Sequence, residues 1–200
     1  MITGLEILAG IVTAFASLIQ LTALDWRGRI GLLALQYLAV FFLIGLVWPL
    51  ALAVIFLVSG WFGAAVLGMA VAGLPGNSLQ NDSLEPSPGS NTIFNLISSA
   101  IILLMAYTYA SQTAEWLPRL DEFQSGAALL LVGLGILQLA FSSSSLSVSI
   151  GLMTIVSGFE VMYAGLTNSQ FAVGLLAVIT LFIALAGAYW MLAPSLEEQP

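Results

Sequence analysis

The sequence predicts an all-α fold, a polytopic bundle of about seven membrane-spanning helices. Two observations support this prediction. Of the 200 residues, 60% are hydrophobic and only 6% are charged, whereas soluble globular chains carry roughly 25% charged residues; the mean hydropathy is +1.07. The apolar residues are also gathered into stretches of about 20, the length that an α-helix needs to cross the hydrocarbon of a bilayer.

The first part of the chain, residues 1–73, is expected to form three N-terminal membrane helices. The first span runs over about residues 2–24 and ends at the charged cluster 25–29, in which Trp26 suits the lipid–water interface. Residues 30–73 contain no charge and are long enough for two spans. The break between these two spans is expected at Trp48 and Pro49, because proline interrupts the hydrogen bonding of a helix.

Residues 74–91 are rich in proline, glycine and asparagine, which rules out a continuing helix and predicts the longest aqueous loop. The segment 92–125 follows with a fourth helix and a short charged connection. The segment 126–200 is expected to form a three-helix unit with an acidic, exposed tail. The last four spans are expected at about residues 92–112, 126–141, 146–166 and 171–192, with links at 115–122, 142–145 and 167–170.

The basic residues predict the orientation in the membrane. Arg27, Arg29 and Arg119 are the three basic residues of the chain. Basic residues in short loops stay on the cytoplasmic side, so Arg27 and Arg29 place the first loop inside. With about seven spans, the N-terminus is then outside, and the serine link 142–145 and the C-terminus are inside. Arg119 falls on the outer side, among three acidic residues, and departs from the rule.

The composition excludes several classes of function. The chain has no cysteine and no histidine, which excludes a CxxC redox pair, the usual zinc sites, an iron–sulfur cluster held by cysteine and a haem held by histidine. A Ser-His-Asp triad is excluded for the same reason, and a Walker loop needs lysine. A net charge of -7 excludes a nucleic-acid footprint. We therefore expect no cofactor, no metal site and no catalysis by this chain alone.

Glu160 is the carboxylic acid that the prediction places deep within a span, about 20 Å along the helix from the serine link. A carboxylate there costs about 2.5–3.5 kcal/mol even on insertion scales, and such residues usually face a bundle interior or a water-filled cavity. Glu160 is therefore the candidate group for loading and releasing a proton. The alternative is a protonated acid that hydrogen-bonds a neighbouring helix. Glu6, near the start of the first span, is expected to be solvated.

Other polar residues within the predicted spans are expected to hydrogen-bond between helices, each contact contributing about 0.6–2 kcal/mol. Gln36, Gln138 and Ser157 are the main candidates for such polar contacts between helices. The remaining polar residues that we assign to this structural role are Gln20, Asn95, Ser98, Ser99, Thr108, Ser149, Thr154 and Thr180.

Small residues recur at every fourth position at Gly60, Ala64, Gly68 and Ala72. Such a ridge lets two helix backbones approach closely. It predicts a packing face on the third helix, whose partner lies either in this chain or in another subunit.

The last three spans resemble the small three-helix subunit K of NADH-quinone oxidoreductase and its relative in Mrp-type sodium/proton antiporters, component C. In that family a tight cytoplasmic turn precedes a helix with a glycine-hydrophobe-glutamate motif, matched here by Gly158-Phe159-Glu160. The whole chain, with four spans ahead of this unit, is more similar to component E of hydrogenase-4-type membrane complexes. The sequence LALQYLAV at residues 33–40 also resembles the corresponding component E helix.

This resemblance implies an accessory subunit of a complex I-like, group 4 hydrogenase-like or Mrp-like assembly in a prokaryotic plasma membrane. Its partners would be other membrane subunits, especially antiporter-like ones, and Glu160 would lie on a proton or sodium path. The sequence departs from the family pattern in two places: serines 142–145 replace basic residues of the turn, and no carboxylate occurs around Ile179 and Thr180. Only the role of Glu160 therefore carries over. A self-contained small transporter and a purely structural membrane subunit are the alternatives.

Overall fold

The computed structural model describes residues 2–20, 25–74, 92–117, 119–142, 144–166 and 169–197. These residues form seven α-helices and no strand, which confirms the predicted all-α fold. Six helices are long and apolar enough to cross a membrane, and the described apolar part of the first helix, Leu8–Gln20, is shorter. The helices are α1 (Ile2–Gln20), α2 (Trp26–Gly45), α3 (Leu50–Ala72), α5 (Thr92–Trp116), α6 (Glu122–Phe141), α7 (Ser145–Leu166) and α8 (Gln170–Glu197).

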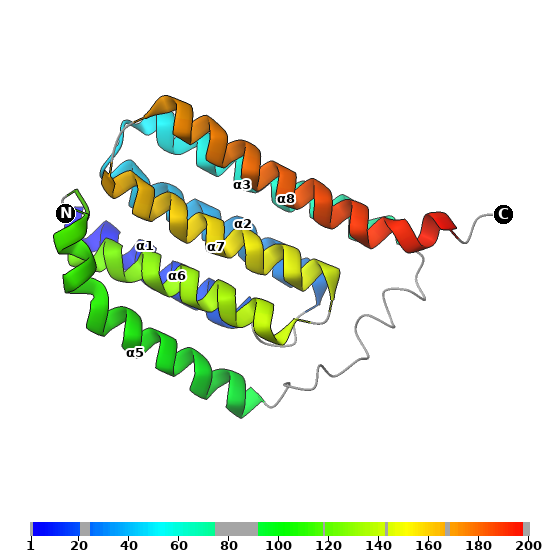
Figure 1. Cartoon of the computed structure of the whole chain (residues 1–200), viewed down its shortest axis with the longest axis horizontal. Coiled ribbons are helices and arrows are strands. Elements are labelled where there is room, and N and C mark those ends of the chain that lie inside the picture. Colours follow the sequence, from blue (N-terminus) through cyan, green and yellow to red (C-terminus); the bar gives the residue numbers. More distant parts are fainter. Residues whose placement is uncertain are drawn as a thin grey trace.

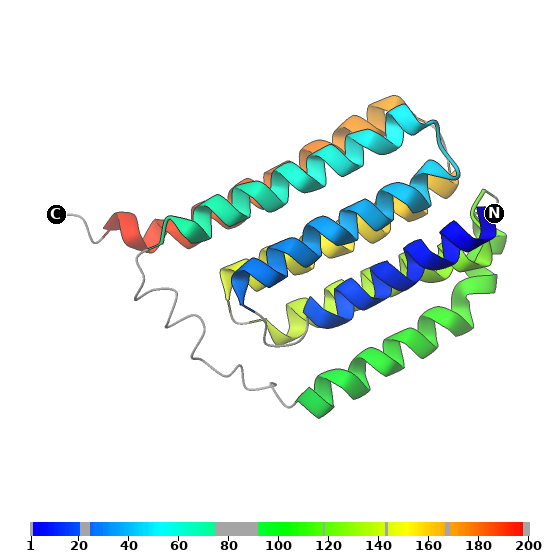
Figure 2. The same ribbon diagram turned by 180° about the vertical axis from the view of Figure 1, so that it is seen from behind.

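The helices form two layers (Figures 1 and 2). One layer consists of α1, α2 and α3, and the other of α5, α6, α7 and α8. Across the boundary between the layers, α1 packs on α6, α2 on α7 and α3 on α8. The two helices of each facing pair run in the same direction (Figure 1). Helix α5 packs along α6 at the edge of its layer, with no helix of the other layer opposite it (Figure 2).

The three segments that the predicted orientation places in the cytoplasm lie at one end of the bundle. Helix α2 begins, α6 ends and α8 ends at the same end of the bundle (Figure 1). The first loop, the serine link and the C-terminal segment are thus on one side, as the assignment of all three to the cytoplasm requires. Which end faces the cytoplasm stays a prediction.

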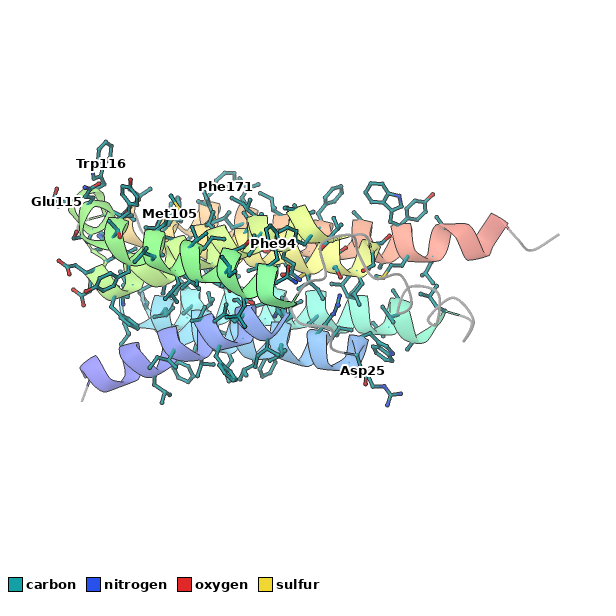
Figure 3. All side chains as sticks on the ribbon, turned by 90° about the horizontal axis from the view of Figure 1, so that it is seen from below. Asp25, Phe94, Met105, Glu115, Trp116 and Phe171 are labelled. Atoms are coloured by element: carbon teal, nitrogen blue, oxygen red, sulfur yellow. The ribbon has the colours of Figure 1, made fainter. Side chains whose placement is uncertain are left out.

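The outer surface has the polarity that a lipid environment favours. In Figure 3, Asp25 and Glu115 lie at opposite ends of the bundle, while Phe94, Met105 and Phe171 project outward from its faces. Phe171 is 83% exposed. Large apolar side chains exposed between charged ends indicate contact with a bilayer, because a soluble protein rarely shows apolar patches of this extent.

The expected break at Trp48 and Pro49 is a turn between α2 and α3. Pro49 directly precedes α3, where its missing N–H leaves no helical hydrogen bond unmade. Trp48 is buried, and its indole N–H donates to the carbonyl oxygen of Ala164 at 3.0 Å. The break thus separates two complete helices rather than interrupting one. Helices α2 and α3 therefore do not form the interrupted-helix type of site that many self-contained transporters use.

Three helices are longer than the hydropathy predicts. Helix α6 begins at Glu122 instead of residue 126, so residue 122 belongs to the helix and not to the predicted link 115–122. Helix α5 continues to Trp116 instead of residue 112, and α8 continues through Pro194 to Glu197 instead of ending near residue 192. Hydropathy measures the thickness of the apolar slab, whereas a helix can continue beyond it into the polar region. Residues 75–91 of the predicted loop 74–91 lie outside the described residues, and so do the side chains of residues 194–200, to which the predicted exposure of the tail refers.

Glycines bring α7 close to α6. A Cβ atom built at Gly151 would lie 3.1 Å from Leu139 Cδ2, and one at Gly158 would lie 2.9 Å from the carbonyl oxygen of Ala128. Gly165, a further seven residues along α7, lies against Leu120 in the turn that precedes α6. Spacing of seven residues keeps the three glycines on one face of the helix, since seven residues make about two turns. The opposite side of α7 is therefore the one that faces α2 and α8.

Candidate functional site

Glu160 lies in the interior of the bundle. It is fully buried on α7, fifteen residues after Ser145 and six before Leu166, which places it about 22 Å from one end of the helix and about 9 Å from the other. The hydroxyl of Thr180 on α8 is 3.1 Å from Glu160 Oε1, and Glu160 Oε2 has no hydrogen-bond partner among the described residues. The site thus contains a buried carboxyl group with one bonded oxygen and one unbonded oxygen.

Tyr37 on α2 forms the second wall of the site. Its side chain is fully buried, and its hydroxyl donates to the carbonyl oxygen of Met153 at 3.2 Å. The same hydroxyl faces both Thr180 and Glu160. The ring of Tyr37 lies directly on Gly60 of α3, where any Cβ atom would overlap the ring. Gly60 therefore makes the space that Tyr37 needs to reach α7.

Gln36 links three helices one residue before Tyr37. It is fully buried. Its amide nitrogen donates to Ser157 Oγ on α7 at 3.1 Å, and its Oε1 accepts from Gln20 Nε2 on α1 at 3.2 Å. Ser17 Oγ, also on α1, is 3.3 Å from the same oxygen. Ser157 lies one turn before Glu160 on α7, so this polar cluster adjoins the carboxyl site along that helix.

Replacing Gln36 with leucine is expected to weaken the attachment of α1 and α7 to α2. The leucine leaves the buried Gln20 amide nitrogen without its acceptor and removes the donor to Ser157 Oγ, which keeps its own bond to the Thr154 carbonyl. The unsatisfied amide costs about 1–3 kcal/mol. The measurement is the free energy of unfolding in detergent. Gln112→Leu on the exposed part of α5 is the matched control and should leave it unchanged. Equal stability of both variants would contradict a bridging role for Gln36.

No charge compensates Glu160 within the described residues. Helix α3 contains no ionisable side chain. Arg29, at the start of α2, hydrogen-bonds Ser147, thirteen residues before Glu160 on α7, or about 20 Å away along the helix. An ionised Glu160 would thus be a buried charge without a counter-charge, which is unfavourable in a medium of low dielectric.

Gln138, Gly68, Ala64, Ala72 and Glu6, which the sequence also singles out, add no described contact to Glu160. Gln138, on α6, is buried, and its amide nitrogen has no partner among the described residues. On α3, Gly60 and Gly68 lie against Tyr37 and Ile30 of α2, so their neighbour is within this chain. Ala64 is buried, Ala72 is exposed, and the side chain of Glu6 lies outside the described residues.

Two residues of the site are not predicted as such from the sequence. Tyr37 is absent from the candidates, and Thr180 is assigned there only to helix contacts, yet the Thr180 hydroxyl is 3.1 Å from Glu160 Oε1 and the Tyr37 hydroxyl faces Thr180. The available signal is weak: a tyrosine and a threonine in apolar helices are common, and their role depends on which helices are neighbours. No protein-family model matches the chain, and no curated protein and no solved structure matches it.

Proposed function

We propose that this multi-pass membrane protein is an accessory subunit of a proton- or sodium-translocating complex and contributes Glu160 to the ion path. The observation that carries the proposal is the fully buried carboxyl group between α2, α7 and α8, with one oxygen unbonded. Ionisable groups inside a membrane are costly and are mostly retained for ion or proton transfer. The resemblance of the glutamate helix to subunit K and of the whole chain to component E favours the same role.

The proposal requires partner subunits. An ion path must cross about 30 Å of hydrocarbon, and Glu160 is the ionisable acid that the described helices bury. A single group cannot relay an ion over that distance, so the other titratable groups must come from neighbouring chains. We expect these to be antiporter-like membrane subunits, which also carry any redox or transport chemistry of the assembly.

The test is ion translocation by membranes that contain the complete complex. We expect Glu160→Gln to reduce translocation to the background of membranes without the complex, because the amide cannot release a proton or hold a cation as a carboxylate does. Glu115→Gln, at the exposed end of α5, is the matched control and should retain the wild-type rate. Purification in mild detergent with mass spectrometry of the co-eluting chains identifies the partners and shows that the variant is assembled.

Two outcomes would overturn the proposal. Unchanged translocation by an assembled Glu160→Gln complex would leave a structural role, in which the acid only hydrogen-bonds Thr180. A chain that elutes alone and transports a solute in liposomes would indicate a self-contained transporter instead.

A further inference from the structure

We propose that the ion held at Glu160 is a proton and that Thr180 is the positioning residue for it, accepting a hydrogen bond from the neutral acid and donating one to the carboxylate. This inference deepens the proposed function, on which its use in translocation rests. It arises from the two hydrogen-bond distances of the Thr180 hydroxyl and from the oxygen atoms that surround Glu160.

The Thr180 hydroxyl has two partners at the same distance. Its oxygen is 3.1 Å from Glu160 Oε1 and 3.1 Å from the carbonyl oxygen of Leu176. A hydroxyl has one hydrogen to donate and lone pairs to accept with. When the hydrogen points to Leu176, a lone pair faces Glu160, and this arrangement fits a protonated acid that donates. When the hydrogen points to Glu160, it fits a carboxylate that accepts.

The exchange between the two arrangements needs only a rotation of the hydroxyl. The carbonyl of Leu176 lies within α8, where the backbone N–H four residues later is its usual partner, so it remains bonded when Thr180 turns away. Proton release breaks the O–H bond of Glu160, transfers the proton to water or to the next titratable group of the path, and leaves a carboxylate. The Thr180 hydrogen then compensates part of the new charge without a movement of the backbone.

The surrounding oxygen atoms suit a proton better than a metal cation. The Tyr37 hydroxyl already donates to Met153 O, and the Leu176 carbonyl already accepts from Thr180. The side-chain oxygens that the described contacts bring to the site are then the two of Glu160, that of Thr180 and, facing Thr180, that of Tyr37. Hard cations take about six or more oxygen ligands, whereas a proton needs one donor and one acceptor at hydrogen-bond distance.

Tyr37 is the titratable group that faces Glu160 from a neighbouring helix. The other helices packed on α7 have their ionisable side chains elsewhere or have none. Helix α3 has none, and Glu122 of α6 is exposed at the first turn of that helix. Tyr189 and Glu197 of α8 are nine and seventeen residues beyond Thr180. Among the titratable groups of these helices, Tyr37 is thus the one that faces Glu160, and Thr180 is the residue that hydrogen-bonds it.

The experiment is infrared difference spectroscopy of the purified full chain in lipid nanodiscs during a pH titration. The carbonyl stretch of protonated Glu160 is the band that Glu160→Gln removes. We expect Thr180→Val to move this band to higher frequency, because the acid loses its acceptor, and Thr180→Ser to restore the wild-type frequency. Thr108→Val is the matched control, because that hydroxyl donates to Leu104 of its own helix on the exposed surface. Exchange of sodium for choline at constant ionic strength should leave the band unchanged.

Three results would overturn the inference: no acid band that depends on Glu160, a band that does not respond to Thr180→Val, or loss of the band on addition of sodium. Restoration by Thr180→Ser separates the loss of the hydroxyl from a general loss of folding. The translocation assay is independent of this spectrum. A shifted band with normal translocation by Glu160→Gln would refute the proposed function alone, and a sodium-sensitive band with impaired translocation would refute the proton assignment alone.

Discussion

Tyr37→Ala is expected to destabilise the bundle by about 3–5 kcal/mol, the usual cost of removing a large aromatic side chain from a packed interior. The ring of Tyr37 is fully buried and fills the space above Gly60. Its hydroxyl also joins α2 to the carbonyl of Met153 on α7. The alanine variant therefore loses packing against α3 and a hydrogen bond to α7 together. The measurement is the free energy of unfolding in detergent micelles.

Two further variants separate these contributions. Tyr37→Phe keeps the ring and removes the hydroxyl, and we expect a loss of about 1 kcal/mol. Tyr107→Ala on α5, where the tyrosine is 82% exposed, is the matched control and should change stability little. Equal losses in the free energy of unfolding for Tyr37→Ala and Tyr107→Ala would contradict the packing of Tyr37 between α3 and α7.

Gly158→Leu is expected to destabilise the contact between α6 and α7 by about 1–3 kcal/mol or more, as overpacking does in closely packed interiors. A Cβ atom at this position would lie 2.9 Å from the Ala128 carbonyl oxygen and 2.9 Å from Leu131 Cβ. A backbone carbonyl cannot move aside as the end of a flexible side chain can. The helices must separate, and the loss of thermal stability in detergent measures the effect.

Gly174→Leu is the matched control for this variant. Gly174 on α8 is exposed, and a Cβ atom there would meet nothing within 4 Å. Both substitutions replace glycine by a better helix former, a gain of up to about 1 kcal/mol, so the difference between them reports the packing term. A Gly158→Leu protein as stable as the Gly174→Leu protein would show that α6 and α7 are not in close contact at this point.

The sequence is sufficient for the class of fold but not for the neighbours of each helix. Apolar stretches of spanning length predict the helices, and Pro49 predicts the turn between α2 and α3. The pairing of α2 with α7 and of α3 with α8 depends on side-chain packing between distant segments. A hydropathy profile contains no information about the packing between helices. The packing role of the α7 glycines is not predicted for the same reason. They are seven residues apart, whereas the small residues of α3 recur at every fourth position and form a recognisable packing pattern.

In the candidate site, too, one residue is predictable from the sequence and the others depend on how the helices pair. Glu160 is conspicuous because a carboxyl group within a span is rare. Tyr37 and Thr180 are ordinary residues for an apolar helix, and they gain significance only because the fold brings α2 and α8 to the same turn of α7. Gln36 is predictable as a contact between helices, but its partners on α1 and α7 are not, because they too depend on the pairing of the helices.

The packing of the helices also determines which parts respond to a charge on Glu160. Helices α6 and α7 are joined along glycine contacts and form the most extensive interface of the bundle, and α3 and α8 form the next most extensive one. The hydrogen bond between Glu160 and Thr180 crosses from the first pair to the second. A change in the protonation of Glu160 therefore acts at the contact between the α6–α7 pair and the α3–α8 pair. We expect it to displace one pair relative to the other as rigid units, with little distortion inside either.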